Sequence, residues 1–289
     1  MSRLFGLSCA KPVHLSCRRV QYDTNSCVST TDSEGISQST SPADGWGIGF
    51  YRNQGSFIFK KVAKEKKREQ FSTISEVISS NIFICHLRYG TIGGRKEVNT
   101  HPFRWGVWLF AHQGTVNQFR RIKPRILRKL PPVYKKLMQG NTDSEHCFYL
   151  YLSLLRGEGG IKKGTIQLSA AVEGLRRFGR MIAEFQKDAD VEQPPELNFL
   201  ISNGSYLLAT RLGCPLYYLM LPGNIQNNTP FYSPTTKLEY QLIPGDGTNR
   251  IIAVASEPLV PMEGWQEVPN NRILTISAEQ EVSSIQWIK

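Results

Sequence analysis

The 289-residue sequence contains no apolar run close to the roughly 20 residues that a membrane-spanning helix needs. Its first residues include an early arginine but no apolar segment of signal-peptide length. Its six cysteines are scattered and form no C-x-x-C pair, and Cys85 and Cys147 lie in apolar segments. Such spacing is typical of reduced thiols and excludes a disulfide framework. We therefore predict a cytoplasmic protein that binds no membrane.

Spacings that hold metals or cofactors are missing as well. No H-E-x-x-H or similar metal spacing occurs among the five histidines, which are His14, His86, His101, His112 and His146. The glycine-rich residues 45–51 lie inside an apolar strand pattern with no helix after them, so they are not a phosphate-binding loop. There is also no G-x-S-x-G nucleophile motif. We predict neither a metal nor a cofactor.

Acidic residues are scarce relative to basic ones, and the formal net charge is +11. Residues 120–136 contain no acid but eight basic residues: Arg120, Arg121, Lys123, Arg125, Arg128, Lys129, Lys135 and Lys136. A solvated outer face away from Arg88 is the favoured interpretation, because few aromatics and no nucleic-acid motif accompany these charges. A surface for an acidic or nucleic-acid partner is the alternative. Hydrophobic residues make up 40% of the chain, enough for the core of one large domain.

Polar clusters follow the apolar runs at 81–85 and 107–111, which are rich in Ile, Val, Phe and Trp. These runs predict buried strands that deliver site residues to one edge of a sheet. The clusters are residues 86–91, 99–103 and 112–114, and a fourth polar cluster follows at 142–145. In that fourth cluster Thr142 and Glu145 form a capping-box pattern, which predicts a helix with Asp143 in its first turn.

The remaining elements follow from periodicity. An amphipathic helix is predicted at 165–186, a short helix around Ile74, Val77 and Ile78, and a hairpin that pairs 47–51 with 56–60. Long loops are predicted at 23–41 and 222–236. Strands are predicted at 3–7, 197–202, 205–210, 215–221, 251–255, 272–276 and 282–288. Strands, helices and strands again indicate antiparallel sheets packed with helices.

These four clusters, in this order, resemble those of the class II glutamine amidotransferases, which are N-terminal-nucleophile hydrolases. Residues 3–6, 42–49 and 255–259 agree with the same family pattern. The resemblance covers nearly the whole chain and implies a single domain over residues 2–289. It also implies an α+β fold, a four-layer αββα sandwich with two antiparallel sheets between helix layers. The implied ligand is glutamine or a γ-glutamyl small molecule, and a separate ammonia-using synthase is a potential partner.

The resemblance also implies roles for individual residues. Once Met1 is removed, Ser2 is the first residue, and its hydroxyl would attack the amide while its α-amine acts as base. Arg88 would clamp the α-carboxylate of the substrate, and Asp143 would accept from the α-ammonium. Thr91 and His101 are expected beside the substrate, and His86 and His112 are expected to brace the site.

Two positions depart from the family pattern. The family normally has cysteine where this chain has Ser2, and asparagine where it has Gln113. Gln113 and Gly114 are expected to form the oxyanion hole, but the Gln113 amide lies one methylene farther out than an asparagine amide. Losing an oxyanion donor costs roughly 2.7–4 kcal/mol. Two hypotheses therefore remain: an amide hydrolase that uses Ser2, and a catalytically impaired protein that binds a glutamyl ligand. An anion-binding protein that acts through 120–136 is a third and weaker one.

Overall fold

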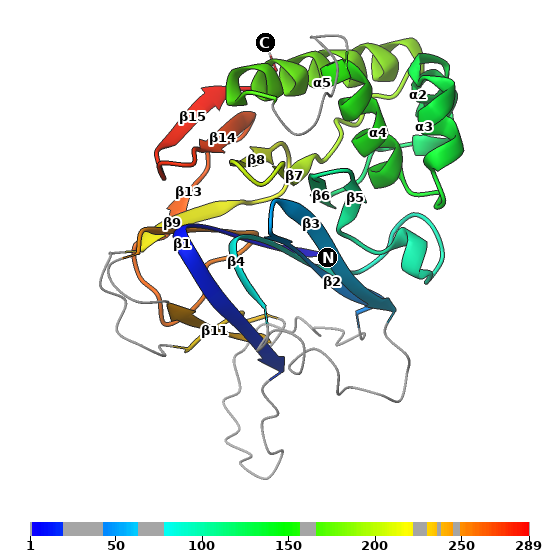
Figure 1. Ribbon diagram of the computed structural model, residues 1–289. Helices are drawn as coiled ribbons and strands as arrows, with labels where there is room; N and C mark the ends of the chain where they lie inside the picture. The colour runs from blue at the N-terminus through cyan, green and yellow to red at the C-terminus, as the bar shows by residue number, and fades with distance from the viewer. Residues whose placement is uncertain are drawn as a thin grey trace, which may run out of the picture.

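The computed structural model describes residues 2–19, 43–62, 78–156, 166–221, 230–235, 238–244 and 249–288. Two antiparallel β-sheets lie face to face, and a layer of helices covers the six-stranded sheet on its outer side (Figure 1). The predicted α+β class, with two antiparallel sheets and helices, is confirmed. The short helix predicted around Ile74 and Val77 and the loop predicted at 23–41 lie outside the described residues.

The nine-stranded sheet is built around β1 (Arg3–Arg19), which is far longer than the strand predicted at residues 3–7. Its main path, in spatial order, consists of β13 (Gln266–Glu267), β9 (Tyr217–Leu221), β12 (Ile251–Ala255), β1, β4 (Ser79–Arg88), β2 (Gly45–Arg52) and β3 (Gly55–Val62). The second half of β1 also pairs with β11 (Leu238–Pro244), which pairs with β10 (Pro230–Tyr232). β10 lies inside the predicted 222–236 loop, which is a correction to that prediction.

The six-stranded sheet contains the strand that leads into the polar cluster at residues 112–114. In spatial order its strands are β15 (Val282–Gln286), β14 (Arg272–Ile276), β8 (Leu207–Arg211), β7 (Asn198–Ser202), β6 (Trp108–Gln113) and β5 (Phe103–Trp105). Every residue of β6 and β7 is buried, because one face packs on the other sheet and the opposite face packs on the helices. Strands covered on both faces read as continuous apolar runs, as the 107–111 run does.

Three hydrophobic clusters hold the layers together. The cluster between the sheets includes Leu4, Ile84 and Leu109, all at most 2% exposed. A larger cluster joins the six-stranded sheet to the helices α2 (Phe119–Lys129), α3 (Pro132–Leu137), α4 (Asp143–Arg156) and α5 (Leu168–Asp188). The third cluster covers the outer face of the nine-stranded sheet with side chains such as Phe231 of β10 and Leu242 of β11.

Most predicted elements are present with shifted ends. The hairpin has the predicted register, with Tyr51 opposite Ser56 and Gly47 opposite Lys60. The helix predicted at 165–186 is α5, which begins three residues later. A short 3-10 helix, η1 (Glu97–Asn99), ends at the first residue of the second polar cluster. Helices α2 and α3 were missed because the 120–136 stretch was read for its charge, although Ile122 and Ile126 are buried four residues apart.

The backbone approaches closely where β2 passes under the second polar cluster. A Cβ atom added at Gly47 would lie 2.2 Å from the carbonyl oxygen of His101, whereas one added at Gly94 would meet nothing within 4 Å. We expect Gly47→Ala to lower the free energy of unfolding by about 1–3 kcal/mol, because backbone atoms must shift to admit the methyl group. Gly94→Ala is the matched control. Urea unfolding that gave equal stabilities for the two variants would contradict this packing.

Candidate active site

Six of the seven residues predicted for the site line one cavity of about 230 Å³ at the end of the sandwich where β1 begins and β4 ends. They are Ser2, Arg88, Thr91, His101, Gly114 and Asp143. Because adjacent antiparallel strands run in opposite directions, the first residues of β1 and the last residues of β4 meet at the same sheet edge. The cavity suits a ligand of amino-acid size, since sites for drug-sized molecules begin at about 300 Å³.

Ser2 is held against the backbone that follows β4. Its Oγ accepts a hydrogen bond from the Tyr89 N–H at 3.1 Å and donates to the Tyr89 carbonyl oxygen at 3.3 Å. The start of β1 is fixed from its other side by Ser256, whose N–H donates to the Leu4 carbonyl and whose Oγ accepts from the Leu4 N–H. Arg3 pairs with Glu257 at 3.4 Å. Residues 255–259 thus hold the N-terminal strand in place.

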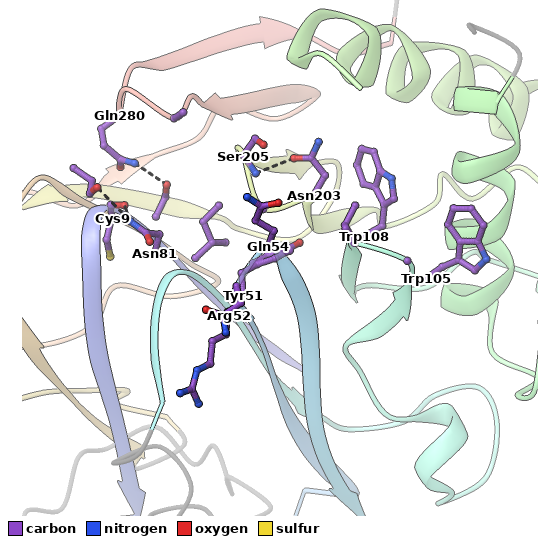
Figure 2. A pocket seen from close by; sticks show the side chains of 18 residues that line it. Cys9, Tyr51, Arg52, Gln54, Asn81, Trp105, Trp108, Asn203, Ser205 and Gln280 are labelled. Atoms are coloured by element: carbon purple, nitrogen blue, oxygen red, sulfur yellow. Dashed lines mark hydrogen bonds between the residues drawn. The ribbon is translucent and has the colours of Figure 1, made fainter. Parts of the chain in front are cut away.

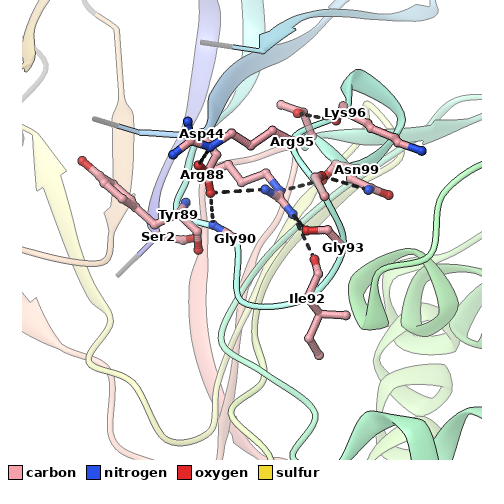
Figure 3. Close-up of polar contacts among 12 residues, drawn as sticks. Ser2, Asp44, Arg88, Tyr89, Gly90, Ile92, Gly93, Arg95, Lys96 and Asn99 are labelled. Carbon is pink, nitrogen blue, oxygen red and sulfur yellow. Dashed lines mark hydrogen bonds and ion pairs between the residues drawn. The ribbon is translucent and has the colours of Figure 1, made fainter. Parts of the chain in front are cut away.

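Arg88 is 3% exposed, and its guanidinium already has several partners. Nε donates to the Asn99 carbonyl oxygen at 3.0 Å, and Nη2 donates to the carbonyl oxygens of Ile92 at 2.9 Å and Gly93 at 3.3 Å (Figure 3). Burial lowers the pKa of Arg88, and the carboxylates of Asp44 and Asp143 act in the opposite direction. Three backbone carbonyls therefore fix the orientation of the side chain that was expected to clamp a carboxylate.

Asp44 is a site residue that the sequence analysis did not single out. One carboxylate oxygen accepts from the Gly90 N–H at 2.7 Å and lies 3.5 Å from Arg88 Nη1, and the other pairs with Arg95. Its own N–H donates to the Arg88 carbonyl oxygen at 2.7 Å. Asp44 therefore holds in place the segment that carries Arg88, and this segment contacts Ser2 through Tyr89. The available signal was its place in the 42–49 motif, where an acid precedes an apolar strand.

Asp143 lies in the first turn of α4, as predicted. One of its oxygens accepts from the Val116 N–H at 2.8 Å and the other from the Ser144 N–H at 2.9 Å. The capping box is half formed: Thr142 Oγ1 accepts from the Glu145 N–H at 3.2 Å, while the Glu145 carboxylate accepts from the N–H groups of Gln139 and Gly140. The fixed carboxylate of Asp143 faces the same cavity as Arg88.

Three buried histidines support the floor of the site. His86 Nε2 donates to the His112 carbonyl oxygen at 3.1 Å, which joins the two sheets, and the rings of His86 and His101 lie 4.1 Å apart. Burial lowers the pKa of His86 to about 3 and holds the pKa of His101 well below its ordinary value. Neither ring nitrogen of His101 has a hydrogen-bond partner in the described residues. These rings are neutral at neutral pH, so they brace the site by packing and hydrogen bonds.

His112 is fixed in one tautomer by its two partners. Nε2 lies 2.9 Å from the Glu196 carbonyl oxygen, which can only accept, so this nitrogen carries the proton. Nδ1 therefore accepts from the Ser144 hydroxyl at 2.9 Å. Burial lowers the pKa of His112. Ser144 and Glu196 both line the cavity and were missed by the sequence analysis, because residues 84 positions apart in the chain meet only in the fold.

Gln113 and Gly114 differ in their placement. Gly114 lines the cavity, and a Cβ atom there would lie 2.2 Å from the Glu196 carbonyl oxygen, so only glycine fits at its positive φ of 132°. Gln113 is 2% exposed and is not among the described residues that line the cavity. Its Oε1 is buried without a hydrogen-bond partner in the described chain. The structure thus brings Gly114, but not the Gln113 side chain, to Ser2.

A larger cavity of about 880 Å³ lies at the other end of the sandwich (Figure 2). Its lining includes Tyr51, Asn81, Trp108 and Gln280, and it contains none of the predicted site residues. We place the candidate site in the smaller cavity because the Ser2 hydroxyl, the buried Arg88 guanidinium and the fixed Asp143 carboxylate converge there. The larger volume of the other cavity does not by itself indicate a reaction there.

Four cysteines of the described chain, Cys9, Cys85, Cys147 and Cys214, are buried and form no disulfide. Burial raises the pKa of each of these thiols, which makes them poor nucleophiles. No group of three or more His, Cys, Asp or Glu side chains among the residues described could hold a metal ion. Within those same residues, no helix is long and apolar enough to cross a membrane.

The fold and this site define a class of protein. The family model for class II glutamine amidotransferases matches residues 1–286, and the chain belongs to this family. The resemblance to this family, inferred from the order of the polar clusters, is thereby confirmed.

Individual relatives agree with that assignment. The chain is 29% identical over 255 residues to the "Probable glutamine amidotransferase DUG3" of Saccharomyces cerevisiae, covering 82% of this chain and 70% of that one. It is 24% identical over 238 residues to a "Gamma-glutamyl-hercynylcysteine sulfoxide hydrolase" of Mycolicibacterium smegmatis, covering 81% and 78%. Among solved structures, a predicted glutamine amidotransferase from Pseudomonas aeruginosa has the same fold, with a TM-score of 0.67, 23% identity, and coverage of 96% and 98%.

The neutral histidines predict how stability depends on pH. An unfolded histidine titrates near 6.5, while folded His86 titrates near 3, so the unfolded state binds more protons between these values. Stability is therefore lost as the pH falls below about 6.5. Between pH 7.5 and 5.5, His86 alone accounts for about 1.4 kcal/mol of that loss.

Urea unfolding at the two pH values measures this loss. We expect His86→Gln, whose amide can still donate to the His112 carbonyl, to reduce the loss by that amount. His14 is exposed, and His14→Gln is the control that should leave the loss unchanged. A loss of equal size in both variants would show that other groups cause the pH dependence.

Proposed function

We propose that the protein hydrolyses the side-chain amide of glutamine or of a γ-glutamyl compound, with Ser2 as an N-terminal nucleophile. The observation that carries the proposal is the convergence of Ser2, Arg88 and Asp143 on one small cavity. Membership of the class II glutamine amidotransferases supports glutamine chemistry. The relative from Mycolicibacterium smegmatis, named as a hydrolase of a γ-glutamyl compound, supports the γ-glutamyl variant.

The chemistry requires Met1 to be removed, so that Ser2 provides both the hydroxyl and a free α-amine. An α-amine has a pKa near 7.7–8.0, so a substantial fraction is neutral and can take the hydroxyl proton at neutral pH. Ser2 Oγ gives up its bond to the Tyr89 carbonyl and attacks the γ-carbonyl carbon. The C–N bond breaks, the amine leaves with the proton, and water then hydrolyses the γ-glutamyl ester on Ser2.

Recognition would rest on the two fixed charges. Arg88 attracts a carboxylate and Asp143 attracts an ammonium, which together select the zwitterionic end of an amino acid. Since both side chains are held by backbone partners, they need little ordering when the ligand binds. Thr91 and His101, which line the same cavity, would limit its shape, and the Gly114 N–H would remain as an oxyanion donor.

A specific observation favours a second candidate, a catalytically impaired member that binds a glutamyl ligand and acts as a binding or regulatory protein. Gln113 lies off the cavity, so one of the two expected oxyanion donors is absent from it. Serine also has almost no anionic population at neutral pH, unlike the cysteine usual in the family. If the enzyme is active, we propose that it works in the cytoplasm and that a separate ammonia-using synthase is its potential partner.

The first test concerns the N-terminus. Intact-mass measurement of the purified protein should show a chain that begins at Ser2, because only a free amine there can act as the base. Complete retention of Met1 would remove that base and leave the binding function as the better candidate.

The second test restores the family pattern. We expect Ser2→Cys combined with Gln113→Asn to raise glutamine or γ-glutamyl hydrolysis by at least about a hundredfold, since losing a single oxyanion donor costs about that much. Ligand affinity should change far less, because Arg88 and Asp143 are untouched.

Release of glutamate and calorimetric titration with glutamine and γ-glutamyl peptides measure the two effects. Ser2→Ala is the control that should bind ligand without hydrolysis, and the two single substitutions separate the nucleophile from the oxyanion donor. If no such ligand binds wild type and the double substitution gains no activity, the glutamyl assignment is wrong.

A further inference from the structure

Asn99, the last residue of η1, carries a buried amide that joins the two segments on which the recognition residues lie. It is 1% exposed and is not among the described residues that line the candidate active site. Its Nδ2 donates to the Gly94 carbonyl oxygen at 3.1 Å, and its Oδ1 accepts from the Asn141 N–H at 3.2 Å. Gly94 belongs to the segment after β4, and Asn141 lies two residues before Asp143. One side chain thus bridges the two segments.

The Arg88 guanidinium depends on Asn99 in two ways (Figure 3). Its Nε donates to the main-chain carbonyl oxygen of Asn99 at 3.0 Å, so this residue is a direct partner. Its Nη2 donates to the carbonyl oxygens of Ile92 and Gly93, which directly precede the Gly94 carbonyl that the Asn99 amide holds. The three carbonyls that orient the guanidinium are therefore on Asn99 or on the segment that its amide fixes.

The Asp143 side of the bridge is the turn that precedes α4. Its Asn141 N–H donates to Asn99, and the neighbouring Gly140 N–H donates to the Glu145 carboxylate at 2.8 Å. The turn is therefore held by η1 on one side and by α4 on the other. Because Asp143 is the first residue of α4, a shift of Asn99 would move the start of the helix that presents this carboxylate.

Two glycines bring the backbone of both segments close to the Asn99 amide. A Cβ atom added at Gly93 would lie 2.9 Å from Asn99 Nδ2, and one added at Gly140 would lie 2.5 Å from Asn99 Oδ1. Packing this close transmits a displacement instead of absorbing it. The distance between the two segments is therefore set by the size and the hydrogen bonds of this one side chain.

We propose that Asn99 is a positioning residue that sets the separation between the Arg88 guanidinium and the Asp143 carboxylate. This inference rests on the proposed function, in which these two groups bind the α-carboxylate and the α-ammonium of a glutamyl ligand. Those two ligand charges lie at a nearly constant separation, because one carbon atom carries both groups. A cavity with the matching separation selects a ligand with a free α-amino acid end over a ligand that has only one of the charges.

Calorimetric titrations with three probes test this role: glutamine has both charges, glutamine α-amide lacks the carboxylate, and glutaramate lacks the ammonium. The parent protein is the Ser2→Ala variant, so that no probe is hydrolysed. It should bind glutamine at least about tenfold more tightly than either single-charge probe.

Asn99→Leu in this parent keeps the number of side-chain heavy atoms but removes both side-chain hydrogen bonds. We expect glutamine binding to weaken by about tenfold, because the two recognition groups no longer match both charges at once. A single-charge probe can follow its one partner, so its affinity should change by no more than about threefold. Asn99→Ala removes the amide without placing apolar atoms there, and it provides the same test if Asn99→Leu does not fold.

Asn203→Leu is the matched control. The Asn203 amide is also buried, and it also accepts from one backbone N–H, of Ser205, and donates to one carbonyl oxygen, of Ile166. It lies at the larger cavity at the other end of the sandwich, so this variant should keep the preference of the parent for glutamine.

A preference for glutamine that survives in the Asn99 variants overturns this inference and leaves the proposed function standing. Equal weakening of all three probes also overturns it, because that result assigns Asn99 a general structural role. A parent that binds glutamine no more tightly than the single-charge probes overturns recognition by Arg88 and Asp143, and this inference with it.

Discussion

The site depends on the central position of β1 in the nine-stranded sheet. Because β1 is hydrogen-bonded to β4 on one side and β12 on the other, its first residues cannot fray as most chain termini do. Ser256 binds both backbone groups of Leu4, and Glu257 pairs with Arg3, so the position of Ser2 is set by residues from the far end of the chain. In the proposed mechanism, Ser2 would therefore have the fixed geometry that side chains on internal strands usually have.

The contact between the two sheets places a second constraint on the chemistry. His86 of β4 reaches the backbone of His112 on β6, and His101 packs against His86, so three imidazoles are buried together. Charging these rings would cost too much in a dry interior, which is why they stay neutral and act as spacers rather than as general bases. In the proposed mechanism, the α-amine of a processed N-terminus is then the base that serves Ser2.

Positive charge is distributed unevenly around the site. The guanidinium of the buried Arg88 donates hydrogen bonds to backbone carbonyl oxygens, and Asp44 accepts one from the Gly90 N–H. Together these contacts fix the segment that follows β4. Arg120 and Arg121 at the start of α2 are exposed, and they line a neighbouring cavity that shares Thr91, Ile92 and Thr115 with the site. The interpretation of residues 120–136 as a face away from Arg88 is therefore wrong for these two arginines.

The sequence by itself determined the family, the two antiparallel sheets, the helix that presents Asp143 and six of the residues that line the cavity. It could do so because strand periodicity, the capping box and the order of the polar clusters are local signals. Only the tertiary structure decided that Asp44, Ser144 and Glu196 join the site, that Gln113 turns away, and that Arg120 and Arg121 line the next cavity. Those outcomes depend on which distant strands and loops pack together and on which face of β6 looks into the cavity, and no local pattern encodes either.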